Sequence, residues 1–220
     1  MAQVIREKCR AEGAAVTFVD AAHIAAAGQT LDGQRFDYGK LKGLAIPLLG
    51  AHQLRNAAVA VETIGALQTQ GWDIPESALR QGLSNTCWVG RFEVMAHSPV
   101  FIVDSAHNPQ GIQTTADTLQ SLFPGQKFLF MFGVLADKDH AAMLDILMPI
   151  AKGFVTVTPA DPRGLPAGEL DFSRCNVPVT PCASVPEGVQ FAIGAASPED
   201  VICALGSLSM VGQLRDCFIR

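Results

Sequence analysis

The sequence predicts an α/β protein: a Rossmann-like C-terminal domain with a mostly parallel sheet, preceded by the tail of a larger α/β domain. Short apolar runs alternate with helical segments after residue 90, whereas the part before it breaks this pattern. With 220 residues, 49% of them hydrophobic, the chain is long enough to bury a core. We therefore predict two domains, an incomplete one over 1–89 and a Rossmann-like one over 90–220.

The first part is expected to begin with a helix and a strand over 15–19, followed by an irregular, Gly-rich polar stretch over 28–43. Apolar residues then recur at helical spacing from Leu54 to Leu67, which predicts a long helix that Gly71 ends. A second, short helix is expected to start near Pro75, with Asp73 as its N-cap.

In the second part, five apolar or β-branched runs predict buried strands. Three helices are expected between them: one capped by Asn108 with Pro109 in its first turn, one capped by Asp139, and one capped by Ser184. Repeated strand–helix alternation implies a parallel sheet with right-handed crossovers. The predicted strands cover 100–104, 127–133, 153–158, 177–180 and 200–205.

Polar residues follow these strands, at the edge where parallel α/β sheets bind ligands. Asp104 and His107 follow the first run, Lys138 the second, Arg163 the third and Ser207 the last. Taken singly, each has a structural explanation, because an Asp after a strand often caps a helix or forms a turn. Together, a carboxylate, an imidazole, two cations and a hydroxyl favour a site for an anionic substrate.

Composition excludes several classes of function. The net charge of −5 and the lack of a Lys/Arg cluster argue against nucleic acid, and no apolar run is long enough to span a membrane. The charged N-terminus is unlike a signal peptide, so we expect a cytoplasmic protein with six reduced cysteines. Neither His nor Cys shows metal-ligand spacing, and the phosphate-loop, dinucleotide and nucleophile-elbow motifs are absent.

Five ordered segments nevertheless resemble one known family. In the order and at about the spacing seen here, they are similar to folylpolyglutamate synthase/dihydrofolate synthase of the Mur ligase superfamily, in its C-terminal half. The segments are Gly50-Ala-His-Gln-Leu-Arg-Asn56-Ala-Ala, Gly90-Arg91-Phe-Glu-Val, Asp104-Ser-Ala-His107-Asn108-Pro109, Phe132-Gly-Val-Leu-Ala-Asp137-Lys138-Asp139 and Gly206-Ser207-Leu.

The resemblance implies an ATP-dependent ligase in which a folate or dihydropteroate carboxylate is phosphorylated by ATP and then attacked by the amine of glutamate. It implies that residues 1–89 are the tail of a central ATPase domain. By resemblance, Asn56 would contact the adenine part of ATP, and Arg91 and Asp104 would bind the nucleotide. His107 would lie near the incoming glutamate and, with Asp104, serve catalysis. Ser207 would help to hold the glutamate carboxylates.

Two departures from the family pattern matter. Ser105 stands where the family loop usually has glycine, and no residues match the family's phosphate loop, Mg²⁺ ligands or carbamylated lysine, which belong to its N-terminal half. We therefore expect the chain to be inactive by itself. Two alternatives stay open: a non-catalytic nucleotide- or amino-acid-binding module derived from such a ligase, and a Mur-type ligase for another amino acid.

Overall fold

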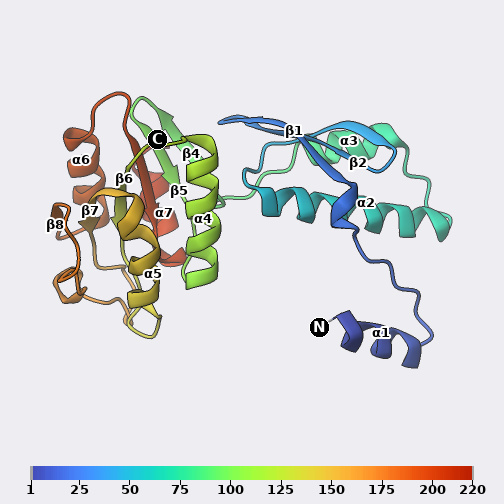
Figure 1. The fold of residues 1–220 in the computed structure, drawn as a ribbon, viewed down its shortest axis with the longest axis horizontal. Coiled ribbons are helices and arrows are strands. Elements are labelled where there is room, and N and C mark those ends of the chain that lie inside the picture. Colours follow the sequence, from blue (N-terminus) through green and yellow to red (C-terminus); the bar gives the residue numbers. More distant parts are fainter. Residues whose placement is uncertain (1, 220) are drawn as a thin grey trace. The chain divides into compact units, whose positions relative to one another are not determined.

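The computed structural model describes residues 2–219, which form two compact units. Unit 1 comprises Met1–Pro47 and Ala51–Thr86, and unit 2 comprises Leu48–Gly50 and Cys87–Arg220. The functional domain boundary at 89/90 stays a prediction. Figure 1 shows the elements of both units along the chain.

Unit 1 is a three-stranded antiparallel sheet packed on two helices. The strand order is β1-β2-β3, and Phe36, Tyr38, Leu44 and Ile46 point into a core with Leu54 and Ala58 of α2. Its elements are α1 (Ala2–Ala11), η1 (Ala21–His23), β1 (Ile24–Thr30), β2 (Gly33–Tyr38), β3 (Leu41–Ile46), α2 (Ala51–Thr69) and α3 (Glu76–Ser84).

Three expectations for this unit were wrong. The stretch 28–43 is not irregular, because its glycines lie in the strands and turns of this sheet. Residues 15–19 form no strand, since no other described strand pairs with them. Asp73 is not the cap of α3; Pro75 occupies that position and offers no side-chain hydrogen bond. The long helix is confirmed, and Gly71 follows it with a φ of +92°.

Unit 2 is a six-stranded sheet of order β4-β5-β9-β6-β7-β8, antiparallel only between β4 and β5. The predicted α/β class with a mostly parallel sheet is confirmed. Its elements are β4 (Glu93–His97), β5 (Val100–Val103), α4 (Pro109–Leu122), β6 (Phe128–Phe132), α5 (His140–Leu147), η2 (Met148–Ile150), β7 (Ala151–Thr156), η3 (Ala167–Glu169), β8 (Val179–Pro181), α6 (Val185–Ala195), β9 (Val201–Leu205), η4 (Leu208–Met210) and α7 (Val211–Asp216).

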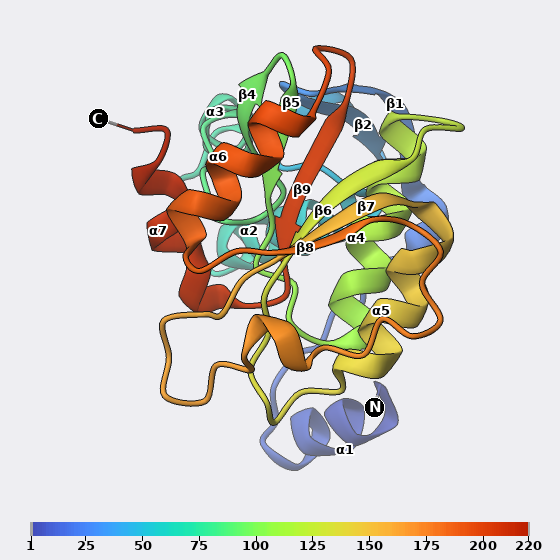
Figure 2. The same cartoon turned by 90° about the vertical axis from the view of Figure 1, so that its left-hand side faces the viewer.

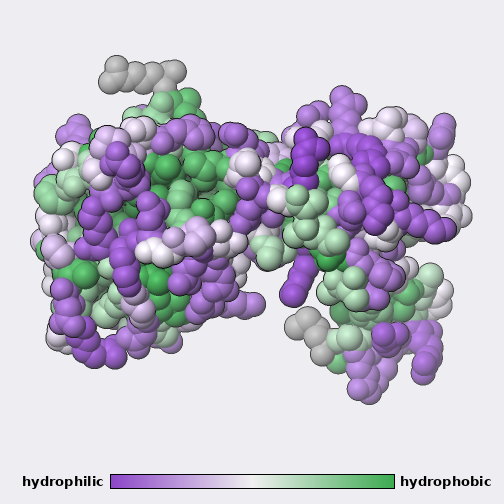
Figure 3. Space-filling model, turned by 45° about the horizontal axis from the view of Figure 1, so that its top comes forward, coloured by the Kyte–Doolittle hydropathy of each residue, from purple (hydrophilic) through white to green (hydrophobic). Residues whose placement is uncertain are grey.

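Helices cover both faces of this sheet. Figure 2 shows α4 and α5 on one side and α6 and α7 on the other. The strands between them are buried on both faces, as their continuous apolar runs predict, and the α6–α7 side forms one core cluster with Met131, Val155 and Ala204. Figure 3 shows that hydrophilic residues are mixed with apolar ones over the surface that it presents. None of the described helices is long and apolar enough to cross a membrane.

The predicted helix caps of unit 2 are confirmed. Asn108, Asp139 and Ser184 each accept a hydrogen bond from a backbone N–H in the first turn of α4, α5 and α6. Sequence analysis missed β4, which lies at the edge of the sheet and follows the Gly90–Phe92 turn directly.

Candidate functional site

The carboxyl ends of β5, β9, β6 and β7 lie next to one another, because these four strands are parallel neighbours. Asp104 and His107 follow β5, Ser207 follows β9, Lys138 follows β6 and Arg163 follows β7. The topology therefore gathers these predicted residues at one edge of the sheet in unit 2.

Asp104 connects two loops of this edge. One carboxylate oxygen accepts a hydrogen bond from Phe92 N at 3.0 Å and the other from Ala106 N at 2.7 Å. Phe92 follows Arg91 directly, and Ala106 precedes His107. A single carboxylate thus ties the backbone beside Arg91 to the backbone beside His107. A further bond between these loops, from Ser105 N to Gly90 O, measures 2.8 Å.

The environment of Asp104 alters its acidity. Burial raises the pKa of the Asp104 carboxyl to about 6, while the hydrogen bonds from Ala106 and Phe92 and the charge of Arg91 act in the opposite direction. Burial is the larger effect. Asp104 is thus poised to change charge near neutral pH while it holds both loops.

His107 has a defined orientation. Its Nδ1 lies 2.9 Å from the Ser105 carbonyl oxygen, which can only accept, so Nδ1 carries the proton in the neutral ring. In that tautomer Nε2 keeps its lone pair and can accept a proton or a hydrogen bond from a ligand. Asn108, the next residue, is used as the cap of α4.

The Ser207 loop joins the same edge. Gly206 N donates to Ala106 O at 2.8 Å, which ties this loop to the one that carries His107. Gly206 has a φ of +109°, and a Cβ there would lie 2.4 Å from Gly133 O, so only glycine fits. The buried Ser207 hydroxyl caps η4 and lies 2.8 Å from Ser209 Oγ.

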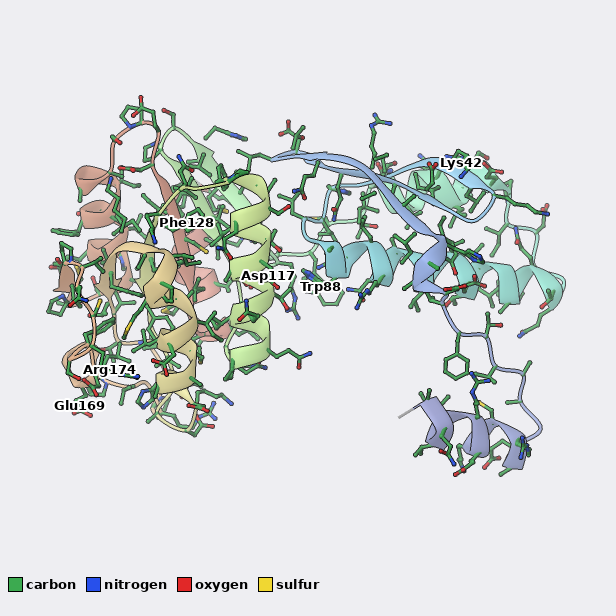
Figure 4. All side chains as sticks on the ribbon, in the orientation of Figure 1. Lys42, Trp88, Asp117, Phe128, Glu169 and Arg174 are labelled. Carbon is green, nitrogen blue, oxygen red and sulfur yellow. The ribbon has the colours of Figure 1, made fainter. Side chains whose placement is uncertain are left out.

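Arg91 differs from the other two cations of the site. Lys138 and Arg163 both lie near Asp137, at 3.5 and 3.6 Å, so an acidic partner partly neutralises them. In the described part of the chain no carboxylate forms an ion pair with Arg91. Its exposed guanidinium instead faces the ring of Trp88, which Figure 4 labels, at 5.8 Å.

Asn56 lies in unit 1, on α2, and donates to Gln53 Oε1 at 3.0 Å. Structural capping, the alternative for these two amides, is not what the contact shows: they pair with each other. A surface pocket of about 460 Å³ also lies in unit 1, beside the β1–β2 turn and Ser84, but none of the predicted site residues lines it.

The comparisons with known proteins agree with this geometry. The sequence profile of the "Mur ligase, glutamate ligase domain" family matches residues 90–208, more than half of the chain. The chain belongs to this family. The match begins at the Gly90–Phe92 turn and ends just after Ser207, so it covers all the loops described above except those of unit 1.

Relatives point to one branch. Folylpolyglutamate synthase of Lacticaseibacillus casei is 39% identical over 141 residues, 61% of this chain and 32% of that enzyme. The solved Mycobacterium tuberculosis folylpolyglutamate synthase complexed with ADP has a TM-score of 0.82 at 25% identity, covering 100% of this chain and 52% of that one. The chain matches the C-terminal portion of this enzyme type, so the predicted family is confirmed.

A third relative was solved with both a nucleotide and a metal. The bifunctional folylpolyglutamate synthase/dihydrofolate synthase of Yersinia pestis, complexed with AMPPNP and Mn ion, has a TM-score of 0.76 at 26% identity and matches 97% of this chain and 50% of that one. The chain thus spans about half the length of these solved relatives, or less in the case of the Lacticaseibacillus enzyme.

Proposed function

We propose that this chain is the C-terminal portion of a cytoplasmic ATP-dependent ligase that adds L-glutamate to the carboxylate of a folate or of dihydropteroate. In this proposal residues 1–89 are the end of the ATPase domain and 90–220 form the glutamate-ligase domain. One observation carries it: Asp104 ties a loop bearing a cation without an acidic partner, Arg91, to a loop bearing an oriented imidazole, His107.

The proposed reaction has two steps. A carboxylate oxygen of the pterin substrate attacks the γ-phosphorus of ATP and releases ADP, which leaves an acyl phosphate. The glutamate amine then attacks the acyl carbon, the C–O bond to phosphate breaks, and amide and inorganic phosphate are formed. The ammonium form of glutamate must lose protons before or during attack, so the step requires a proton acceptor.

The residues of this chain suit distinct parts of that reaction. The planar, permanently charged fork of Arg91 can bind phosphate oxygens, and we assign Asp104 the role of holding its loop at the nucleotide. His107 Nε2 can take a proton from the glutamate amine. Asn56 is assigned to the adenine part of ATP. Ser207 is assigned to the glutamate carboxylates, although its hydroxyl already caps η4.

Magnesium is assigned to the complete enzyme rather than to this chain. No group of three or more His, Cys, Asp or Glu side chains among residues 2–219 could hold a metal ion. The residues do not fit a metal site, and no step above is assigned to one. We accordingly propose that the 220-residue chain alone does not ligate glutamate, and that its partner is the N-terminal half of the same enzyme.

A glutamate-incorporation assay tests the assignment. The native protein that contains this chain would be isolated from its source with an antibody and incubated with ATP, Mg²⁺, labelled glutamate, and either dihydropteroate or a reduced folate. We expect labelled product from the native protein and none from the recombinant 220-residue chain. ADP binding without product from the native protein would instead support the non-catalytic module, and product from the recombinant chain would contradict its predicted inactivity.

A further inference from the structure

The turn that carries Arg91 has an unusual backbone. Gly90 has a φ of +67° and Phe92 a φ of +47°, so both neighbours of Arg91 adopt left-handed conformations. For a bulky residue such as phenylalanine this conformation is unfavourable and persists only where the surrounding structure imposes it. The position of Arg91 therefore depends on the contacts that hold this turn.

Three hydrogen bonds hold the turn, and two of them come from the loop after β5. Ser105 N donates to Gly90 O, and Phe92 N donates to Asp104. The third involves a residue that the proposed mechanism does not use: Gly90 N donates to Glu93 Oε2 at 2.8 Å. Glu93 is the first residue of β4.

The other carboxylate oxygen of Glu93 is held from the far end of the chain. Arg215, in α7, donates through Nε to Glu93 Oε1 at 3.1 Å, and both side chains are mostly buried, with 30% and 23% of their surfaces exposed. The same helix also packs on the turn: a Cβ on Gly90 would lie 2.8 Å from the Val211 side chain. Helix α7 thus fixes the turn by shape and, through Glu93, by charge.

We propose that Glu93 and Arg215 are positioning residues for Arg91. Arg215 fixes the Glu93 carboxylate, Glu93 fixes the Gly90 amide, and the fixed turn sets where the Arg91 guanidinium stands. Neither residue touches the ligand in this proposal. The inference rests on the proposed function only in taking the Arg91 ligand to be a nucleotide phosphate.

A matched surface pair separates positioning from simple charge pairing. Arg174 lies 2.6 Å from Asp145, and both side chains are at least half exposed. Figure 4 shows Arg174 on the side of unit 2 away from Trp88. Exposed pairs of this kind contribute little to stability, so Arg174→Ala removes an arginine without disturbing the turn.

The test uses the 220-residue chain in five forms: wild type, Glu93→Ala, Arg215→Ala, the double variant and Arg174→Ala. The first readout is the hydrogen-exchange rate of the Gly90 amide by NMR, with the Phe130 amide as the reference for global folding. We expect exchange about tenfold faster in Glu93→Ala and several-fold faster in Arg215→Ala, because a charge-assisted hydrogen bond is lost or weakened. Glu93→Gln keeps an acceptor oxygen and should restore part of the protection.

The double variant gives the decisive comparison. If Arg215 acts through Glu93, adding Arg215→Ala to Glu93→Ala changes the Gly90 exchange rate no further, whereas independent effects would multiply. Multiplying effects, or an unchanged Gly90 rate in Arg215→Ala, would overturn the proposal. A similar acceleration in Arg174→Ala would also overturn it, because it would show a general loss of structure.

The second readout is ADP affinity by titration, with Arg91→Ala as the reference variant. We expect Arg215→Ala to weaken ADP binding several-fold and Arg174→Ala to leave it unchanged. If the wild type binds ADP through Arg91 and Arg215→Ala binds it equally well, the positioning role fails while the proposed function stands. If the wild type binds no ADP, the nucleotide assignment of Arg91 fails, and the exchange experiment alone decides whether the pair holds the turn.

Discussion

At the scale of single residues, Asp104 combines two opposing demands. It must accept hydrogen bonds from the backbone of two loops, for which the ionised form is best, yet it lies in surroundings that favour the neutral form. Its pKa of about 6 compares with an ordinary value of 3.8, which makes the carboxyl a source of pH-dependent stability.

The sign of that dependence follows from proton binding. Between pH of about 4 and 6, folded Asp104 holds a proton that the unfolded chain has lost, so its contribution to stability falls as pH rises. The shift corresponds to about 3 kcal/mol in the free energy of unfolding between pH 4 and 7. Asp104→Asn should abolish this component, which urea unfolding of both proteins at pH 4, 5, 6 and 7 would measure.

Asp200 provides the control. Its pKa is lowered, chiefly by Lys152, so its contribution is lost as pH falls through the acid range rather than gained. The difference between wild type and Asp200→Asn should therefore change in the opposite direction and below pH 4. A difference between wild type and Asp104→Asn that stays constant from pH 4 to 7 would contradict the raised pKa.

Gly206 gives a second prediction at this scale. Alanine there needs a φ of +109° and places its Cβ 2.4 Å from Gly133 O, a backbone atom that cannot move aside cheaply. We expect Gly206→Ala to lower the free energy of unfolding by more than about 2 kcal/mol, measured by urea unfolding. Gly212→Ala in α7, where nothing lies within 4 Å, should be neutral or slightly stabilising, and equal losses in both variants would count against the close approach.

At the scale of elements, the central strands of unit 2 could be predicted because they are apolar throughout and separated by capped helices. Strand β4 could not, since its residues are only partly buried and its pairing with β5 is antiparallel. The segment 15–19 has strand composition but no described strand beside it, and composition cannot show whether a partner exists. The sheet of unit 1 escaped because glycines read as loop punctuation although they lie at its turns.

The two aspartates predicted as helix caps differ in the structure, and stability should reflect it. Asp139 accepts from Ala142 N at 3.1 Å, so Asp139→Ala should cost about 1 kcal/mol, whereas Asp73→Ala should change stability by less than about 0.5 kcal/mol because Asp73 caps nothing. Thermal unfolding of both variants measures the two values. A loss on Asp73→Ala equal to that on Asp139→Ala would support the cap assignment made from sequence.

At the scale of the whole molecule, the candidate site was foreseeable where it depends on topology. Parallel neighbours place Asp104, His107 and Ser207 at one edge, and the rule for ligand sites in such sheets identifies that edge. What could not be foreseen is how the loops are joined. Nothing in the sequence indicates that Glu93 takes the Gly90 amide, or that Arg215, 122 residues later, holds Glu93.

The division into two units leads to the last prediction. Each unit has its own hydrophobic core, with Phe36 fully buried in one and Phe130 fully buried in the other. Phe36→Ala and Phe130→Ala should each cost about 3–5 kcal/mol, but only within the unit that carries the change. Urea unfolding followed by hydrogen-exchange mass spectrometry resolves the units, because peptides of each report their own transition.

The expected pattern is specific. Phe36→Ala should move the transition of unit 1 peptides to lower urea and leave unit 2 peptides unchanged, and Phe130→Ala should do the reverse. Phe191→Ala, at a side chain 43% exposed on α6, serves as the control and should move neither by more than a small amount. A single transition that both core variants shift equally would show that the units fold as one cooperative body, since an independent core cannot transmit the loss of a phenylalanine to its neighbour.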